Sequence, residues 1–285
     1  MNKTALVTGG SHNIGQGIAI TLAKHGYDVS ITYNTRKEGA LETKRQIEEL
    51  GQKCWIYQAT LDREDIPQKT VDQAHKDMGH IDLLVCNAAN GGVRGSILTI
   101  TPDYLNHIIA LNFRNYILCA AAASRHMVAD KIAGNVIFIT STHGERAYPN
   151  DFLYGSLKAA VERAAESMAL DLASYGIRVN CIAPGAIWQL RPDAPPPAFV
   201  TECIPLQRVG TPAEIGELDV FLVSDAGSYI TGMTIRQDGG LILPGMMELR
   251  DPPPVWLPKE WHEQEYQTAM KMLEEQSNAT EHEFR

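Results

Sequence analysis

The chain has 285 residues and a mass of 31.4 kDa, the size of one large α/β domain or of one domain with an appendage. Hydrophobic residues make up 44% of it and charged residues 21%, which predicts a globular protein with a sizeable core and excludes a disordered one. The formal net charge of −9 excludes the basic surface that nucleic-acid binding requires and argues against a membrane partner.

Targeting and redox signals are weak. No apolar run approaches the roughly 18 residues of a membrane span, and because the N-terminus leads directly into a strand pattern we expect no signal peptide. The cysteines are odd in number, scattered and without a C-x-x-C pair: Cys54, Cys86, Cys119, Cys181 and Cys203. We therefore expect a cytoplasmic protein with reduced thiols and without a metal site or disulfide framework.

Short β-branched runs alternate with longer helical patterns along the first 245 residues. The runs that predict strands are Ala5–Thr8, Val29–Tyr33, Cys54–Gln58, Leu83–Cys86, Val136–Thr140, Arg178–Ile182 and Thr234–Gln237. The patterns that predict helices are Ile14–His25, Gly39–Leu50, Ile66–Met78, Pro102–Met127, Tyr154–Tyr175 and Pro212–Val223. This alternation predicts an α/β fold with a doubly wound parallel sheet, in which ligands bind beyond the carboxyl ends of the strands.

Two proline clusters divide the chain. The first, between residues 192 and 197, lies inside the main body and predicts a loop of restricted flexibility. The second, between residues 252 and 258, separates that body from a tail, and residues 246–285 together contain nine acidic and four basic residues. We expect one domain over residues 1–245, followed by a proline-rich linker and a short helical tail over residues 246–285.

A glycine-rich segment, Thr8-Gly9-Gly10-Ser11-His12-Asn13-Ile14-Gly15, follows the first predicted strand and opens a helix. Glycine lets the backbone approach a pyrophosphate, whose charge then meets the helix N-terminus. The alternative is an ordinary turn between a strand and a helix.

The second strand ends in Tyr33-Asn34-Thr35-Arg36-Lys37, two cations without a carboxylate. An acid here would hold the adenosine ribose hydroxyls and repel a 2′-phosphate, so its absence favours NADP(H), with NAD(H) as the alternative. His12 is a second candidate phosphate contact. The alternative is that Arg36 and Lys37 are ordinary solvated residues at the start of a helix.

Tyr154 and Lys158 stand four residues apart, on one face of a helix, and follow Ser141 at the end of the fifth strand. A tyrosine has a reference pKa of about 10 and is a poor base at neutral pH. We expect the ammonium of Lys158, together with a cationic nicotinamide ring, to lower the pKa of Tyr154. A single Y-x-x-x-K pattern is common by chance alone. The position of this one, after a central strand and a serine, makes chance a poor explanation.

These residues, with Asn87-Ala88, Asn112 and Pro184-Gly185, resemble the short-chain dehydrogenase/reductase family over about residues 1–245, in its 3-oxoacyl-reductase-like or sugar-dehydrogenase-like branch. The resemblance implies a single Rossmann-type, dinucleotide-binding catalytic domain and hydride transfer between a nicotinamide and a carbonyl/alcohol pair. Tyr154 would then be the general acid or base, and Ser141 would position the reacting oxygen. Lys158 would bind the nicotinamide ribose, and Asn112 would hold a water that relays protons.

The resemblance also implies a cofactor-binding set spread over the carboxyl edge of the sheet: Gly9, Ser11, His12, Asn13, Ile14, Asn34, Thr35, Arg36, Leu61, Asn87, Ala88, Ala89, Tyr154, Lys158, Pro184, Gly185 and Ile187. The sequence departs from the family pattern at Asn13, where a glycine is usual, and at Gln189, where a threonine usually touches the carboxamide. We expect Asn13 to keep the turn, because asparagine tolerates the left-handed conformation. The family often has an acidic residue near the adenine after the third strand; here that position is Thr60 or, with a slip of one or two residues, Asp62, and the sequence does not place it.

The substrate side of the predicted site is polar and cationic. The candidate substrate residues are Arg94, His143, Arg146 and Trp188, with Glu145 and Arg191 nearby. This set favours a polyhydroxylated or carboxylated small molecule, a sugar or sugar acid. The alternatives are a 3-oxoacyl-thioester reductase and a sensor or scaffold that binds NADP(H) without catalysis.

The segment Tyr116–Ala123 is apolar nearly all round, and one sheet face cannot bury every side of such a helix. This pattern favours a subunit interface, and the family resemblance implies a homotetramer. The tail, with Trp256 and Trp261, would cover a neighbouring active site or pack on its own body; a disordered appendage is the alternative.

Overall fold

A computed structural model describes residues 2–91, 97, 100–189, 195–243 and 267 of the chain. The predicted substrate residue Arg94 and nearly all of the predicted tail lie outside the described residues. The proposed division of the chain at residue 245 therefore stays a prediction.

Seven parallel strands form one sheet in the order β3-β2-β1-β4-β5-β6-β7. Every predicted strand is present within two residues of its predicted ends: β1 (Thr4–Val7), β2 (Asp28–Tyr33), β3 (Cys54–Gln58), β4 (Leu83–Cys86), β5 (Asn135–Ile139), β6 (Arg178–Pro184) and β7 (Thr234–Gln237). The order reverses between β1 and β4, and the carboxyl ends on either side of this switch point are where such sheets bind ligands. The predicted doubly wound sheet is confirmed.

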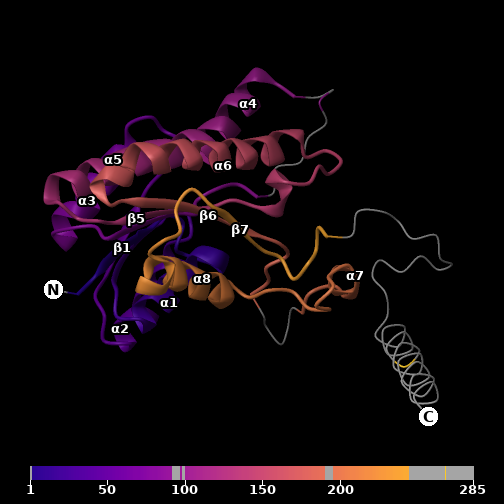
Figure 1. Cartoon of the computed structure of the whole chain (residues 1–285), viewed down its shortest axis with the longest axis horizontal. Helices are drawn as coiled ribbons and strands as arrows, with labels where there is room; N and C mark the ends of the chain where they lie inside the picture. The colour runs from indigo at the N-terminus through magenta and orange to yellow at the C-terminus, as the bar shows by residue number, and fades with distance from the viewer. Residues whose placement is uncertain (1, 92–96, 98–99, 190–194, 244–266, 268–285) are drawn as a thin grey trace, which may run out of the picture.

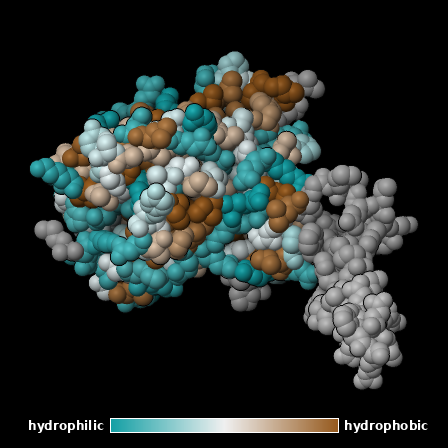
Figure 2. Space-filling model, viewed as in Figure 1, coloured by the Kyte–Doolittle hydropathy of each residue, from teal (hydrophilic) through white to brown (hydrophobic). Residues whose placement is uncertain are grey.

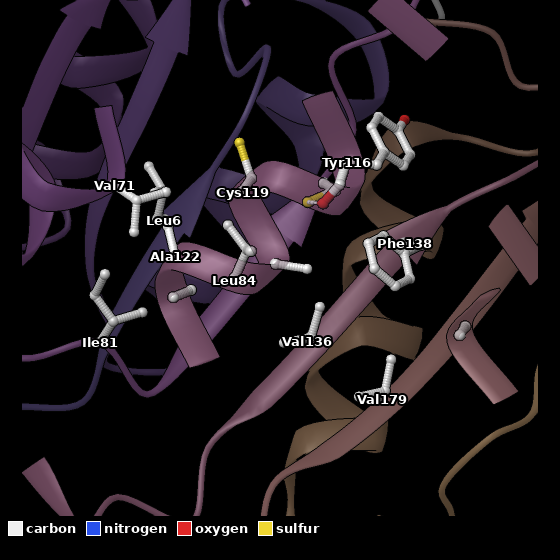
Figure 3. Packing of buried hydrophobic residues seen from close by; sticks show 14 of the residues in the cluster. Leu6, Val71, Ile81, Leu84, Tyr116, Cys119, Ala122, Val136, Phe138 and Val179 are labelled. Atoms are coloured by element: carbon white, nitrogen blue, oxygen red, sulfur yellow. Dashed lines mark hydrogen bonds between the residues drawn. The ribbon is translucent and has the colours of Figure 1, made fainter. Parts of the chain in front are cut away.

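Helices cover both faces of the sheet (Figure 1). One layer contains α1 (Asn13–Lys24), α2 (Lys37–Glu49) and α8 (Pro212–Val223), and the other contains α3 (Ile66–Met78), α5 (Asn115–Asp130) and α6 (Phe152–Leu172). Alternate residues of a strand point to opposite faces, so Leu6 and Leu84 pack in one core cluster while Ala5 and Leu83 pack in the other. Figure 3 shows the first cluster, between the sheet and the α3/α5 layer. Burial on both faces explains why the strand sequences do not alternate.

The predicted helix Pro102–Met127 is wrong as a single element. It consists of α4 (Pro102–Ile109), a π-helical turn (Ala110–Arg114) and α5. Asn115 inside this region donates from Nδ2 to the carbonyl of Ala88 at 3.2 Å, which ties the irregular backbone to the loop after β4. π-Turns often occur at functional sites, and this one carries Asn112.

The structure also contains α7 (Ala198–Glu202), a short helix directly after the first proline cluster that the sequence analysis did not predict. Proline fixes a φ angle that suits the start of a helix, and Pro197 occupies the N-cap of α7. Among the described residues, no helix is long and apolar enough to cross a membrane, and no group of three acidic, histidine or cysteine side chains is arranged to hold a metal. The surface in Figure 2 is mainly hydrophilic, with separate hydrophobic patches, as is usual for a globular domain.

Candidate active site

The glycine-rich loop between β1 and α1 forms a tight cradle at the carboxyl edge of the sheet. Gly9 has a φ of +70°, and a Cβ on Gly15 would lie 2.3 Å from the Gly9 carbonyl oxygen. Asn13 has a φ of +46°, so the expectation that asparagine adopts the left-handed conformation at this position is confirmed. The cradle leaves no room for side chains and exposes backbone to whatever lies above it, as a pyrophosphate site requires.

The loops after β1 and β4 are held together by Thr8 and Asn87. The hydroxyl of Thr8 accepts hydrogen bonds from the backbone N–H groups of Asn87 at 2.9 Å and Ala88 at 3.0 Å. The side-chain amide of Asn87 donates to the Thr8 carbonyl at 3.0 Å and the Gly9 carbonyl at 3.3 Å. Asn87 therefore acts on the glycine loop, which it holds in place.

A cavity of about 600 Å³ runs along this edge. It brings together most of the predicted cofactor-binding set: Gly9, Ser11, His12, Asn13, Ile14, Asn34, Thr35, Arg36, Leu61, Asn87, Ala88, Ala89, Tyr154 and Lys158. Pro184, Gly185 and Ile187 are not among its lining residues. Gly185 instead packs against Asp238, to which its Cβ would come within 2.6 Å, and Ile187 pairs with Gly210 in an isolated β-bridge.

At the far end of the cavity, Arg36 and His12 lie close enough to interact electrostatically. Burial and the nearby charge of Arg36 lower the pKa of His12, which favours its neutral form. Asp62 also lines the cavity, whereas Thr60 donates its hydroxyl hydrogen to Asn34 Oδ1 at 3.3 Å. Of the two residues, Asp62 is the one at the cavity, and its position near an adenine stays a prediction.

His107 also lines the cavity, although it is not among the predicted site residues. Its Nδ1 lies 3.1 Å from Asp62 Oδ2, so a residue of α4 and the loop after β3 meet across the cavity. Nothing in the sequence pattern of α4 marks this histidine as a cavity residue.

Lys158 lies at the inner end of the cavity and is almost completely buried, with 2% of its surface exposed. Its Nζ donates to the Ile139 carbonyl at 2.8 Å and to the Tyr116 hydroxyl at 3.3 Å, and stands over the Tyr116 ring at 4.9 Å from the centroid. Burial lowers the pKa of Lys158 to about 8. The amine is therefore fixed in place and able to give up its proton near neutral pH.

Tyr154 lies one helical turn before Lys158, with Lys158 Nζ 5.6 Å from the centroid of its ring. The surroundings of Tyr154 within the chain raise its pKa, and the lowering expected from Lys158 together with a cationic nicotinamide ring stays a prediction. Burial is the largest cause, the hydrogen bond with Ser141 lowers the pKa in part, and the charge of Asp151 raises it. The phenol therefore keeps its proton at neutral pH.

Asn112 is fully buried in the π-turn, and its side-chain amide is bound by the backbone of Asn90. Its Oδ1 accepts from the Asn90 N–H at 2.8 Å, and its Nδ2 donates to the Asn90 carbonyl at 3.1 Å. Asn112 thus joins the π-turn to the loop after β4. The water relay through Asn112 stays a prediction.

Of the predicted substrate residues that the structure describes, His143 contacts Tyr154 directly. His143 lies beside Tyr154, with ring centroids 5.6 Å apart, while Arg146 is exposed and stands over the ring of Tyr148. Trp188 donates its backbone N–H to the Gly210 carbonyl at 2.9 Å, on the segment that follows β6. Glu145 forms an ion pair with Arg236 at 2.9 Å.

Comparison with known families agrees with this geometry. A family model described as enoyl-(acyl carrier protein) reductase matches residues 9–242. The chain belongs to the short-chain dehydrogenase/reductase family and is an oxidoreductase of that family, in agreement with the resemblance noted in its sequence.

Three relatives illustrate the range of this family. Glucose 1-dehydrogenase 2 of Bacillus subtilis is 34% identical over 86% of this chain and 97% of its own. The 3-oxoacyl-[acyl-carrier-protein] reductase FabG of Staphylococcus epidermidis is 32% identical over 85% of this chain and 100% of its own. The solved structure of acetoin dehydrogenase YohF from Salmonella typhimurium matches with a TM-score of 0.81 and 30% identity, over 86% of this chain and 99% of that one.

Proposed function

We propose that this oxidoreductase prefers NADP(H) and acts on the carbonyl or secondary alcohol group of a polar substrate, either polyhydroxylated or carboxylated, such as a sugar or sugar acid. The observation that carries the proposal is the arrangement of Tyr154. Its phenol meets the hydroxyl of Ser141 at the cavity, with the buried amine of Lys158 one turn below. This arrangement is suited to moving one proton at a substrate oxygen.

The cavity fits a dinucleotide. The close approach of Gly9 and Gly15 leaves a backbone cradle for the pyrophosphate at the start of α1, and the cavity continues from there to Arg36 in one direction and to Tyr154 in the other. When bound, the nicotinamide supplies or accepts the hydride.

The residues of the chain supply the proton. In reduction, Tyr154 donates its phenolic proton to the carbonyl oxygen as negative charge develops there, and its raised pKa keeps that proton in place beforehand. Ser141 donates a hydrogen bond to the same oxygen and so fixes its position. Lys158 stabilises the phenolate that remains, and its pKa of about 8 suits it to return a proton.

The preference for NADP(H) rests on the adenosine end of the cavity. Asn34, Thr35 and Arg36 follow β2 there, without a carboxylate that would repel a 2′-phosphate. His12 lies beside Arg36 and is a second hydrogen-bonding partner for the same group.

Two relatives support a hydroxylated substrate. Glucose and acetoin, named in the descriptions of those proteins, both carry an oxygen on the carbon next to the reacting one. The polar pair of His143 and Asp151, which contacts Tyr154 through the His143 ring, suits such a molecule better than a long apolar chain.

A second candidate function is reduction of a 3-oxoacyl thioester. The description of the matching family model and the relative FabG favour it. A protein that binds NADP(H) without turnover, as a sensor or scaffold, is a remote third candidate.

We further propose that the protein is a cytoplasmic homotetramer. The exposed side of α5 and α6 forms an apolar groove of about 460 Å³, lined in part by Ile117, Ala121, Val128, Met168 and Leu172. The five cysteines are free, which supports a reducing compartment. A molar mass of about 31 kDa in solution by light scattering, the mass of one chain, would contradict the assembly.

A substrate panel tests the proposed function. The purified enzyme is assayed with NADPH and NADH against sugars, sugar acids, small hydroxyketones and acetoacetyl thioesters. We expect turnover of hydroxylated substrates and a higher kcat/KM with NADPH. Rapid turnover of the thioesters alone would establish the second candidate, and coenzyme binding without turnover on any substrate would establish the third.

A further inference from the structure

The imidazole of His143 is held on several sides beside the catalytic phenol. Its Nδ1 lies 2.7 Å from Asp151 Oδ2, one face stacks on Tyr148 with centroids 4.2 Å apart, and its ring meets Tyr154 at an interplanar angle of 81°. Its backbone N–H donates to Ser141 Oγ at 3.2 Å. The ring is therefore as firmly positioned as Ser141 and Tyr154 themselves.

The side chain of Asp151 binds His143 and does not cap its own helix. It is the N-cap residue of α6, where an aspartate normally accepts a hydrogen bond from the first turn of the helix, yet its side chain makes no such bond. The carboxylate is 9% exposed and binds His143 instead. A carboxylate that binds one ring nitrogen of a histidine fixes the orientation and the tautomer of that ring.

The other nitrogen of the ring is available. The side chain of His143 is 37% exposed, and Nε2 has no partner among the described residues. In the tautomer in which Nδ1–H is donated to Asp151 Oδ2, Nε2 is a hydrogen-bond acceptor. A free acceptor beside the phenol that binds the reacting oxygen is suited to a neighbouring hydroxyl group.

We propose that the His143–Asp151 pair is a specificity-determining site that accepts a hydrogen bond from a hydroxyl group on the carbon adjacent to the reacting carbon. The site selects α-hydroxy carbonyl compounds and vicinal diols over ketones and alcohols that lack the second oxygen. This inference rests on the proposed function and narrows its substrate class, because a carboxylate alone would not donate to Nε2.

The test uses matched substrate pairs that differ in one hydroxyl group. Hydroxyacetone and acetone are compared in reduction, and an aldohexose and its 2-deoxy analogue in oxidation, with wild-type enzyme and with His143→Phe and His143→Gln. Phenylalanine keeps the aromatic stacking, whereas glutamine keeps an acceptor. We expect His143→Phe to lower the ratio of kcat/KM for the hydroxylated member over the other by about tenfold, mostly through KM, and His143→Gln to restore part of it. His25→Phe, at an exposed histidine paired with Glu217, is the control and should leave the ratio unchanged.

The outcomes separate this inference from the proposed function. If wild-type enzyme turns over the pairs and His143→Phe lowers both members equally, His143 has a structural role and the inference is wrong. An unchanged ratio has the same consequence. If wild-type enzyme turns over neither pair but reduces acetoacetyl thioesters, the proposed substrate class fails and this inference fails with it.

Discussion

The two halves of the cavity are built by different means. The coenzyme half consists mainly of backbone held at close quarters, with Gly9, Gly15 and the Thr8–Asn87 hydrogen bonds as its frame. The catalytic half consists of side chains whose properties depend on burial, above all Tyr154 and Lys158. Changes in the first half should alter coenzyme binding, whereas changes in the second should alter the chemical step.

Removal of the Tyr154 hydroxyl tests the catalytic half and has the largest expected effect. Tyr154→Phe keeps the ring packing with His143 but removes the only proton that the proposed mechanism transfers to the substrate oxygen. We expect kcat to fall about 10³-fold, with a coenzyme dissociation constant close to that of the wild type. Steady-state kinetics and a fluorescence titration with NADPH measure the two quantities. Near-normal turnover by folded, coenzyme-loaded Tyr154→Phe would disprove the mechanism.

Gly15→Ala tests the coenzyme half. The new Cβ would lie 2.3 Å from the Gly9 carbonyl oxygen and 2.5 Å from Asn87 Nδ2, so the loop must move. We expect the dissociation constant for NADPH to rise by about 10- to 100-fold, since overpacking of this kind costs about 1–3 kcal/mol. Gly79→Asn is the matched control, because Gly79 has open space and a positive φ that asparagine tolerates. A normal affinity in Gly15→Ala would show that the cradle does not hold the dinucleotide.

This contrast also explains what the sequence could predict. The glycine spacing and the turn at Asn13 were readable because steric limits on backbone are local. The effect of burial on the pKa of Tyr154 could not be predicted from the sequence, because it depends on distant elements. The ammonium one turn away pointed instead to a lower pKa. His107 was not predicted for a related reason: its place at the cavity, opposite Asp62, depends on tertiary packing that the pattern of α4 does not encode.

Arg36→Ser tests the coenzyme preference, with an intermediate expected effect. Arg36 is exposed, so loss of a charge-assisted hydrogen bond to a 2′-phosphate should cost about tenfold in kcat/KM with NADPH and little with NADH. Lys37→Ser, at the next exposed cation, is the matched control and should change the ratio less. Equal losses with both coenzymes would place Arg36 at a group that NADPH and NADH share, and the preference for NADP(H) would lose its support.

Asp219 offers the smallest effect on activity and sharpens the comparison between burial and catalysis. Like Lys158, it is fully buried, but neither carboxylate oxygen has a hydrogen-bond partner among the described residues. Burial raises its pKa well above the usual carboxyl value, so the folded state favours the protonated form. Its contribution to stability is therefore greatest below the pKa of an unfolded aspartate and is lost as the pH rises through the raised folded pKa.

Asp219→Leu replaces the carboxyl group at a position packed among apolar residues of α8, such as Ile215 and Leu222. We expect the free energy of unfolding at pH 7 to rise by about 2 kcal/mol, with activity unchanged. Asp219→Asn separates the effect of charge from that of polarity. It should abolish the fall in stability with rising pH, but it should raise the free energy of unfolding less than Asp219→Leu does. Denaturant unfolding between pH 4 and 8 measures both variants. If Asp219→Leu destabilises the protein at pH 7, the carboxylate has a partner in the assembled protein. Asp219 would then resemble Lys158, whose buried amine is hydrogen-bonded, and the comparison between the two would fail.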